Sequence, residues 1–272
     1  MTEYLKKRLS MFNIELFSSI SIEHCHITKE YKLTRIFDDT SKLSVIMIAV
    51  PYLVKTNNKN VSAYAVSNDY HIFFKELFDV LIPELEDKFA GHRFCGFADD
   101  SPIDERHAAA RCGLGIIGDN QMLITEKYSS YVFLGEIITD FPIKCPPPKE
   151  IKKCEGCGRC KKACPMKKIG VCLSALTQKK GELNEEDANV IKKHGSVWGC
   201  DICQEVCPHT IRAIDSGTIY TDIDFFKQDV ISTLTKEILD SMSEEDFKRR
   251  AYSWRGRLTI DRNLSLFDTE KN

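Results

Sequence analysis

The sequence predicts an α+β protein in which a first domain with a mixed sheet is followed by a small cysteine-rich domain and a short helical tail. Residues 43–50 are apolar and rich in β-branched side chains, which predicts a strand buried on both faces. Residues 68–85 repeat apolar side chains at helical intervals. Eight of the twelve cysteines lie between Cys154 and Cys207, so the two halves of the chain differ in character.

The first domain is expected to span residues 1–143 and to contain both helices and strands. In chain order, we expect a helix at 3–18, a strand at 43–50, a helix at 68–85, a strand at 93–98, a helix at 102–112, and strands at 121–125 and 131–139. Asn68 and Ser101 are the expected N-caps of the two later helices, because short polar side chains accept hydrogen bonds from free backbone N–H groups. Asp99 then lies at a junction between a strand and a helix.

Prolines at 142 and 146–148 follow the last of these strands and place a domain boundary near residue 143. The second domain, residues 144–228, is rich in lysine and poor in long apolar runs. We therefore expect bound metal to supply much of its folding energy. Residues 229–272 form the expected helical tail.

Composition and the N-terminal residues are those of an ordinary globular protein. The net charge is −2, with 43% hydrophobic and 29% charged residues, so overall charge indicates no partner. Residues 1–17 lack the apolar core of a signal peptide, and the longest apolar run is shorter than the roughly 18 residues that cross a membrane. We expect a cytoplasmic monomer without a membrane partner, whose reduced thiols favour metal binding over disulfides.

The first cysteine run has the spacing of bacterial ferredoxins. Cys154, Cys157, Cys160 and Cys164 are separated by two, two and three residues, and Pro165 follows. In such a run three thiolates bind one [4Fe–4S] cluster, while the fourth binds the other cluster. The run therefore implies a second set of cysteine ligands.

A second run supplies that set. Cys200, Cys203 and Cys207 are followed by Pro208, and Cys172 completes eight thiolates. The crossing of the last cysteine of each run assigns Cys154, Cys157, Cys160 and Cys207 to one [4Fe–4S] cluster, and Cys164, Cys172, Cys200 and Cys203 to the other.

Structural zinc is the alternative, because cysteines two residues apart are also zinc ligands. A third cysteine three residues further on, with proline behind it, favours the iron–sulfur interpretation. The four other cysteines are expected to be buried or incidental thiols. These are Cys25, Cys95, Cys112 and Cys145.

Several segments between about residues 40 and 210 carry a family resemblance. They are AVPY at 49–52, DYH at 69–71, FADDSPIDER at 97–106, GLGIIGDN at 113–120, FLGE at 133–136, CLSALT at 172–177 and GCDICQEVCP at 199–208. Together they resemble the epoxyqueuosine reductases, which are related to reductive dehalogenases. The resemblance implies a nitroreductase-like first domain that binds cobalamin, next to two [4Fe–4S] clusters that pass electrons to the cobalt. The implied reaction is the reductive deoxygenation of epoxyqueuosine to queuosine in tRNA.

The resemblance also implies roles for individual residues. Asp99 matches the general acid, and Arg106 matches an arginine that helps to set it. We expect burial beside the corrin to raise the pKa of Asp99. Without the resemblance, Asp99 and Asp100 would be interpreted as a turn and a cap, and His71 as a helix-start histidine bonded to nearby backbone. The implied cobalamin-binding residues are Tyr70, His71, Asp99, Gly115, Gly118, Asn120, Ser174, Cys200 and Asp201.

The sequence departs from the family in two places. Ile116 and Asp119 stand where the family usually has tryptophan and lysine, and the chain ends at Asn272, before the helical repeats that help the family to hold tRNA. Residues 144–180 contain eleven Lys or Arg against two Glu, a surface that attracts either tRNA or an acidic flavodoxin or ferredoxin-type electron donor.

Alternatives to tRNA deoxygenation therefore stay open. One is a corrinoid and iron–sulfur reductase of a nucleoside or another small electrophile. The other is a double-cluster electron-transfer protein without catalysis of its own.

Overall fold

The computed structural model describes residues 1–166 and 170–267. The strands are β1 (Leu16–Ser21), β2 (Ser44–Pro51), β3 (Phe94–Phe97), β4 (Ile116–Ile117), β5 (Leu123–Ile124) and β6 (Val132–Thr139). The helices of the first half are α1 (Thr2–Ser10), α2 (Glu30–Thr34), α3 (Tyr70–Lys88) and α4 (Glu105–Arg111), with 3-10 turns η1 (Ile22–His24) and η2 (Ala63–Ala65). Those of the second half are α5 (Arg159–Ala163), α6 (Leu173–Thr177), α7 (Glu185–His194), α8 (Ile202–Glu205), α9 (Pro208–Asp215), α10 (Asp224–Lys227), α11 (Lys236–Ser241), α12 (Glu244–Lys248) and α13 (Arg257–Ser265), with η3 (Ser253–Arg255).

The main sheet has the strand order β1-β2-β6-β3, and every neighbouring pair is antiparallel. The expected mixed sheet is therefore wrong, although the expected mixture of helices and strands is confirmed. The physical reason is the path of the chain. Helix α3 returns the chain so that β3 runs in the same direction as β2, and β6 then enters between them in the opposite direction.

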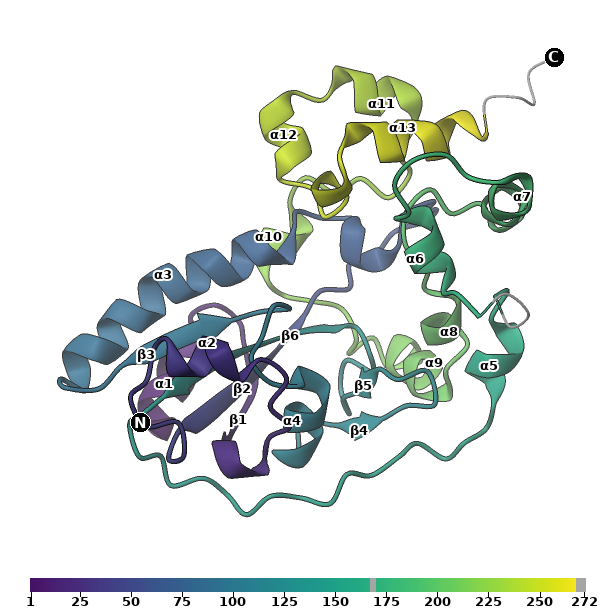
Figure 1. Cartoon of the computed structure of the whole chain (residues 1–272). Coiled ribbons are helices and arrows are strands. Elements are labelled where there is room, and N and C mark those ends of the chain that lie inside the picture. Colours follow the sequence, from purple (N-terminus) through teal and green to yellow (C-terminus); the bar gives the residue numbers. More distant parts are fainter. Residues whose placement is uncertain (167–169, 268–272) are drawn as a thin grey trace.

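Helices cover both faces of this sheet, as Figure 1 shows. On one face Ile46 and Ile48 pack with α1 and α3, and on the other Val45 and Met47 pack with α2 and α4. Every residue of β2 is buried. The prediction of a strand buried on both faces is confirmed, because a sheet between two helical layers has no solvated side.

The N-terminal helix is shorter than predicted. It ends at Ser10, and Asn13 takes a left-handed backbone conformation with φ 57° before β1 begins at Leu16. Pairing of β1 along the length of β2 outweighs the helical spacing of its apolar side chains.

Two predicted N-caps lie one to three residues from the observed ones. Asp69, and not Asn68, accepts the hydrogen bond from the backbone N–H of His71 at the start of α3. Asp104, and not Ser101, accepts from the N–H of His107 and so caps α4. The Ser101 hydroxyl is instead turned into the interior.

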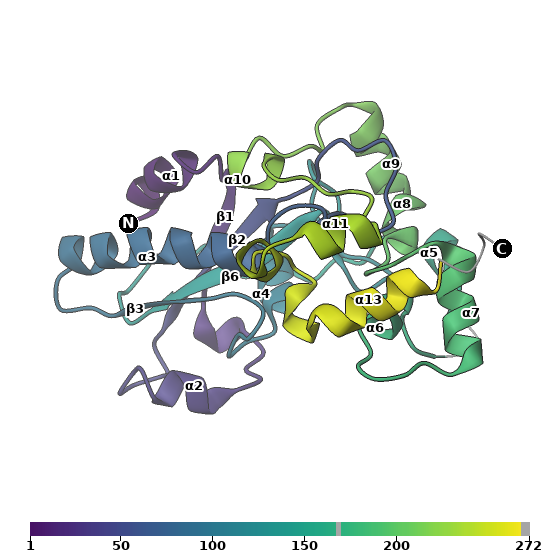
Figure 2. The same ribbon diagram turned by 90° about the horizontal axis from the view of Figure 1, so that it is seen from above.

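The C-terminal helices form a separate packed layer at the top of the molecule (Figure 1). Helices α11 and α13 lie side by side in both ribbon views (Figure 2). Their apolar side chains pack around Trp198, which is fully buried, and against Val61 and Val66 of the first half. The segment expected as a tail is thus joined to both halves of the chain.

No helix in the described ranges, 1–166 and 170–267, is both long enough and apolar enough to cross a membrane.

Candidate functional site

One cavity contains the four cysteines that the spacing assigns to the first cluster. Its walls include Cys154, Cys157, Cys160 and Cys207. The thiols surround a space and do not converge on one point: among the residues that the structure describes, no three His, Cys, Asp or Glu side chains are placed to hold a single metal ion. The backbone N–H of Asp119 donates to Cys154 Sγ at 3.3 Å. Such N–H donors stabilise a thiolate ligand.

The four cysteines predicted to bind the second cluster form a group beside the first. They are Cys164, Cys172, Cys200 and Cys203. Burial raises the pKa of the Cys200 thiol to about 11, and the neighbouring Cys172 adds to that rise. Burial also raises the pKa of Cys203, with contributions from Cys172, Cys160 and Cys164. Because Cys160 belongs to the first group and acts on Cys203, the two groups lie next to one another.

The incidental cysteines lie elsewhere. Cys112 is buried in the core beneath the sheet, and burial raises its pKa to about 11 and that of Cys25 to about 12. Buried thiols outside a ligand-type spacing act as small apolar side chains.

The glycine loop packs against the hairpin of β4 and β5. A Cβ atom on Gly115 would lie 2.4 Å from the carbonyl oxygen of Ile124, and one on Gly118 would lie 2.4 Å from Asn120 Oδ1. Asn120 lines the first thiol cavity, and its side chain lowers the pKa of Cys203 by hydrogen bonding. The loop therefore reaches both cysteine groups. Gly115 and Gly118 are needed because a larger side chain at either position would collide with the residues packed against it.

Asp119, one of the two departures from the family, has a cation beside it. Lys161 Nζ lies 3.1 Å from Asp119 Oδ2, directly after the ligand candidate Cys160. The reversed charge in the loop is thus balanced from α5. The other departure, Ile116, pairs with Ile124 in the two-stranded sheet.

Tyr70, His71 and Asp99 meet where α3 begins. His71 Nδ1 lies 2.8 Å from Asp69 Oδ1, and its Nε2 lies 3.6 Å from Asp99 Oδ2. The two carboxylates, Asp69 first, raise the pKa of His71 to about 9. Burial raises the pKa of the Tyr70 phenol, and the neighbouring Asp99 adds to it.

The state of Asp99 differs from the expectation. Its side chain is 70% exposed, and the hydrogen bond with His71 lowers the pKa of its carboxyl, whereas a buried carboxyl with a raised pKa was predicted. The reason is a partner 28 residues earlier in the chain, which stabilises the carboxylate. Asp99 also has a left-handed backbone, with φ 65°.

Arg106 does not contact Asp99 through a hydrogen bond or ion pair in the described structure. Its guanidinium donates to the carbonyl oxygen of Gln121 at 2.8 Å, so it ties α4 to the turn between β4 and β5. In this structure Arg106 therefore supports the glycine loop and does not orient Asp99.

Ser174 and Asp201 lie where the two halves of the chain meet. Gln178 donates to Ser174 Oγ and to Tyr64 Oη, both at 3.0 Å, which joins α6 to η2. Asp201 is only 4% exposed and accepts from Ser62, from Lys59 and from the N–H of Ala63. The donors of the first half of the chain therefore saturate this carboxylate, which links the two halves next to Cys200.

Sequence reasoning missed a pair of carboxyl groups behind Asp99. Glu136 is fully buried in β6, and burial together with Glu105 raises its pKa well above the usual range. Burial raises the pKa of Glu105 to about 7. An acidic residue inside an otherwise apolar strand was the available signal for Glu136, because buried carboxyls require a specific partner.

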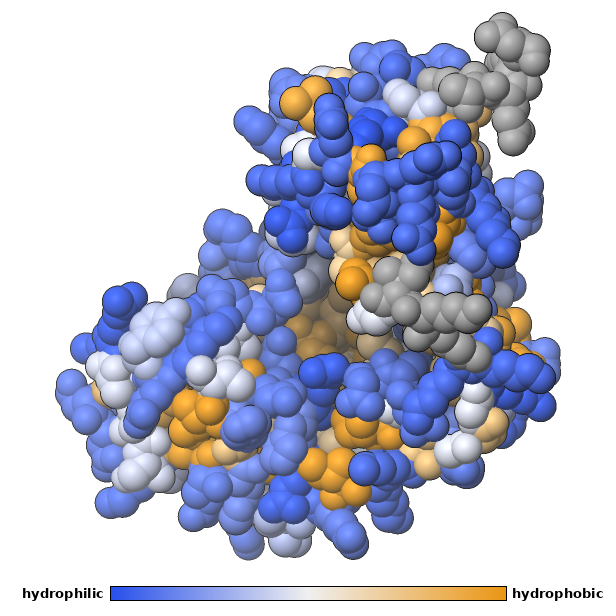
Figure 3. Space-filling view, turned by 45° about the vertical axis from the view of Figure 1, so that its right-hand side comes forward, coloured by the Kyte–Doolittle hydropathy of each residue, from blue (hydrophilic) through white to orange (hydrophobic). Residues whose placement is uncertain are grey.

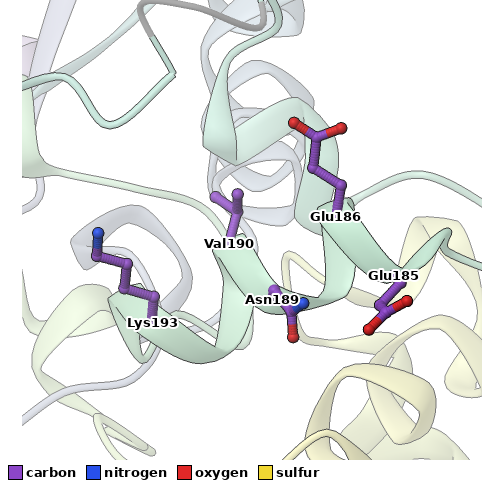
Figure 4. Close-up of a pocket in the computed structure, with 5 residues that line it drawn as sticks. All are labelled: Glu185, Glu186, Asn189, Val190 and Lys193. Carbon is purple, nitrogen blue, oxygen red and sulfur yellow. The ribbon is translucent and has the colours of Figure 1, made fainter.

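The space-filling view shows a hollow lined by apolar atoms between the sheet-bearing part and the upper helical part (Figure 3). Another pocket lies on α7, and Figure 4 shows that its side chains come from one helix and point in different directions. That second pocket contains none of the predicted site residues. It is lined by Glu185, Glu186, Asn189, Val190 and Lys193.

Two adjacent groups of four cysteines, in an α+β chain that also holds a histidine–carboxylate couple, are the kind of donor set typical of proteins with iron–sulfur clusters. No protein-family model matches the chain. The epoxyqueuosine reductase of Gloeobacter violaceus is 32% identical over 219 residues, which is 76% of this chain and 68% of that protein. The one of Listeria monocytogenes is 31% identical over 285 residues, 97% of this chain and 73% of that protein. This chain belongs to the epoxyqueuosine reductase family and is an oxidoreductase.

Solved structures agree with this assignment. A crystal structure of epoxyqueuosine reductase with an epoxyqueuosine-modified tRNA-Tyr stem loop has a TM-score of 0.76 and 25% identity to this chain. The match covers 97% of this chain and 80% of that one. A selenomethionine-labelled epoxyqueuosine reductase gives a TM-score of 0.75 at 25% identity. The family resemblance expected from the sequence is confirmed.

Proposed function

We propose that this protein is a cobalamin-dependent iron–sulfur reductase that removes the epoxide oxygen of epoxyqueuosine in tRNA. The observation that carries the proposal is the adjacency of the two four-cysteine groups, in a chain that also holds the couple of His71 and Asp99. Membership of the family supplies the reaction, since its named members are epoxyqueuosine reductases.

The two cysteine groups suit [4Fe–4S] clusters in donor type and in number. Four thiols line one cavity, and four others lie beside it. We assign Cys154, Cys157, Cys160 and Cys207 to one cluster, and Cys164, Cys172, Cys200 and Cys203 to the other. Thiolate ligation and backbone N–H donors such as that of Asp119 set the potential of such clusters.

The apolar hollow suits a corrin, and residues from both halves would hold it (Figure 3). We assign to it Tyr70, His71, Asn120 and Ser174. The Tyr70 ring is half-buried and stacks on Phe133, with 4.3 Å between the ring centroids. Bound cobalamin would supply the strongly reducing metal centre that the deoxygenation requires. The hydrogen bonds of Gln178 to Tyr64 and Ser174 fix α6 relative to η2.

The couple of His71 and Asp99 supplies one proton. Loss of an epoxide oxygen as water consumes two protons and two electrons: the electrons would enter through the clusters, the couple would give one proton, and solvent water would give the other. At neutral pH the couple holds one proton, because the pKa of His71 is raised to about 9 while that of Asp99 is lowered. Asp99 is the more exposed of the two side chains, at 70% against 50%. We assign it the contact with the substrate, with His71 as its source of the proton.

We propose tRNA as the substrate and a flavodoxin or ferredoxin-type protein as the electron donor, in the cytoplasm. The basic residues between 144 and 180 provide attraction for either polyanion. Two of them, Lys167 and Lys168, lie outside the described residues.

The test is a single-turnover assay under anaerobic conditions. Reduced protein, reconstituted with iron, sulfide and cobalamin, is offered an epoxyqueuosine-containing tRNA stem loop and, separately, the free nucleoside. Mass spectrometry of the nucleoside should show loss of one oxygen from the stem loop. Reaction of the free nucleoside alone would transfer the proposal to a small-molecule substrate, and reaction of neither with cobalamin bound would refute it.

A further inference from the structure

Asp99 occupies a strained turn that requires support from its surroundings. The backbone N–H of Asp100 donates to the carbonyl oxygen of Ala98 at 2.8 Å, which closes a three-residue turn with Asp99 at its centre. The φ angle of 65° at Asp99 is rare for a residue with a side chain. A non-glycine residue keeps such a conformation only where neighbouring groups determine it.

Two groups of contacts hold this turn. On the solvent side, Lys29 and Lys32 form ion pairs with the carboxylate of Asp100. On the interior side, the backbone N–H of Asp99 donates to Glu105 Oε1 at 3.2 Å. Glu105 is therefore the interior acceptor that fixes the residue proposed above as the acid.

Glu105 is backed by a second carboxyl that is fully buried. Glu136 accepts a hydrogen bond from the Ser101 hydroxyl through Oε1, but its Oε2 atom is buried without a hydrogen-bond partner. The neighbouring charge that acts on Glu136 is the carboxyl of Glu105. Two ionised carboxylates in such a place would repel one another, whereas one proton between them satisfies the orphaned oxygen.

Titratable groups that ionise to negative charge surround Glu105 and Glu136 on several sides. Asp99 and Asp104 act on Glu105 from the turn and from the cap of α4. Tyr70 also lies within the field of Glu105, and the thiols of Cys25 and Cys95 lie within that of Glu136. Burial and this acidic environment raise the pKa of both glutamates, which agrees with a retained proton.

We propose that Glu105 and Glu136 share one proton at neutral pH and that this singly protonated pair fixes the Asp99 turn from behind. Both are positioning residues, since they act through Asp99 and not on the substrate. The inference depends on the proposed function only for the role given to Asp99.

Infrared spectroscopy tests the shared proton without any assay of activity. Protein labelled with ¹³C-glutamate should show a labelled carboxylic-acid C=O band at pH 7, where ordinary glutamates are ionised. Glu136→Gln should remove the band, because its amide donates to Glu105. Glu76→Gln, on the exposed face of α3, is the matched control and should keep it. Absence of the band in the unaltered protein, or its persistence in Glu136→Gln, would overturn the shared proton.

The support of the turn is tested through His71. In Glu105→Ala the N–H of Asp99 loses its acceptor and Asp99 moves away from His71, so NMR titration should show the His71 pKa falling from about 9 to roughly 8, while Asp69 keeps it above its ordinary 6.5. Glu105→Gln keeps a carbonyl acceptor and should keep the raised value. In Glu105→Ala kcat should fall by about 100-fold with KM near that of the unaltered protein, because misplacing a catalytic group by an ångström costs about that much. An unchanged His71 pKa in Glu105→Ala would refute the support.

The two proposals fail in distinguishable ways. If Asp99→Asn remains active while the infrared band and the His71 response appear as expected, the role of Asp99 is wrong and the carboxyl pair stands. If the band is absent while Asp99→Asn is inactive, the pair is wrong and the acid stands.

Discussion

Replacing Asp99 with asparagine separates the chemistry of this residue from its structural role. Asparagine tolerates the left-handed backbone that Asp99 adopts, and it is similar in size, so we expect the turn to persist. The substitution leaves the proton of His71 in place but removes the carboxylate that would pass it to the substrate, which is also one of the two carboxylates beside His71. Asp69, at 2.8 Å from His71 Nδ1, stays in place.

The structure indicates a small electrostatic effect and a large kinetic one. The separation of 3.6 Å between His71 Nε2 and Asp99 Oδ2 belongs to a pair in which both side chains are at least half exposed. Such a pair contributes about 1 kcal/mol at most, which corresponds to a fall in the His71 pKa from about 9 to roughly 8. Loss of general acid catalysis lowers kcat by about 10²- to 10⁴-fold.

The assay compares anaerobic turnover of the modified stem loop with the NMR titration of His71 in the same variant. Asp79→Asn is the control, because Asp79 is a 60% exposed carboxylate of α3 that pairs with Lys75. We expect this control to keep most of its activity. An Asp99→Asn variant that turns over as fast as Asp79→Asn would refute the acid role.

Three other outcomes are expected. The value of kcat/KM should fall as the pH rises through about 9, because His71 then loses the proton that the couple supplies. Protonated His71 also stabilises the fold, fully below about pH 6.5. A pH series of chemical unfolding should show this contribution to the free energy of unfolding disappearing toward pH 9. Cys172→Ala should lower the iron content from about eight to about four atoms per chain on chemical analysis, and an unchanged content would assign the eighth ligand elsewhere. Gly135→Ala places a Cβ atom 2.4 Å from the Phe74 ring, so denaturant unfolding should show a loss of about 1–3 kcal/mol; an unaltered midpoint would mean that the ring moves freely.

Local patterns predicted the central elements of the fold. The apolar run of β2 and the helical spacing of α3 both led to elements of nearly the expected length, because each is specified by its own residues and by burial. Strand β1 was missed, since its pairing partner β2 lies almost thirty residues away and outweighs a helical pattern. Antiparallel insertion of β6 between β2 and β3 is likewise a property of the whole chain path.

The site divides in the same way. Cysteine spacing predicted which four thiols share a cavity, because the ferredoxin pattern encodes the crossing of ligands. The ionisation of Asp99 was predicted with the wrong sign, since His71 reaches it from another element. Glu136 was overlooked because its meaning depends on Glu105, which only the folded chain brings beside it.

The most direct test of the proposed function is the metal and corrin content of the protein after anaerobic reconstitution. We predict about eight iron and eight sulfide per chain, with one cobalamin bound at saturation. Zinc in place of iron at these thiols, or a chain with both clusters that binds no cobalamin, would contradict it.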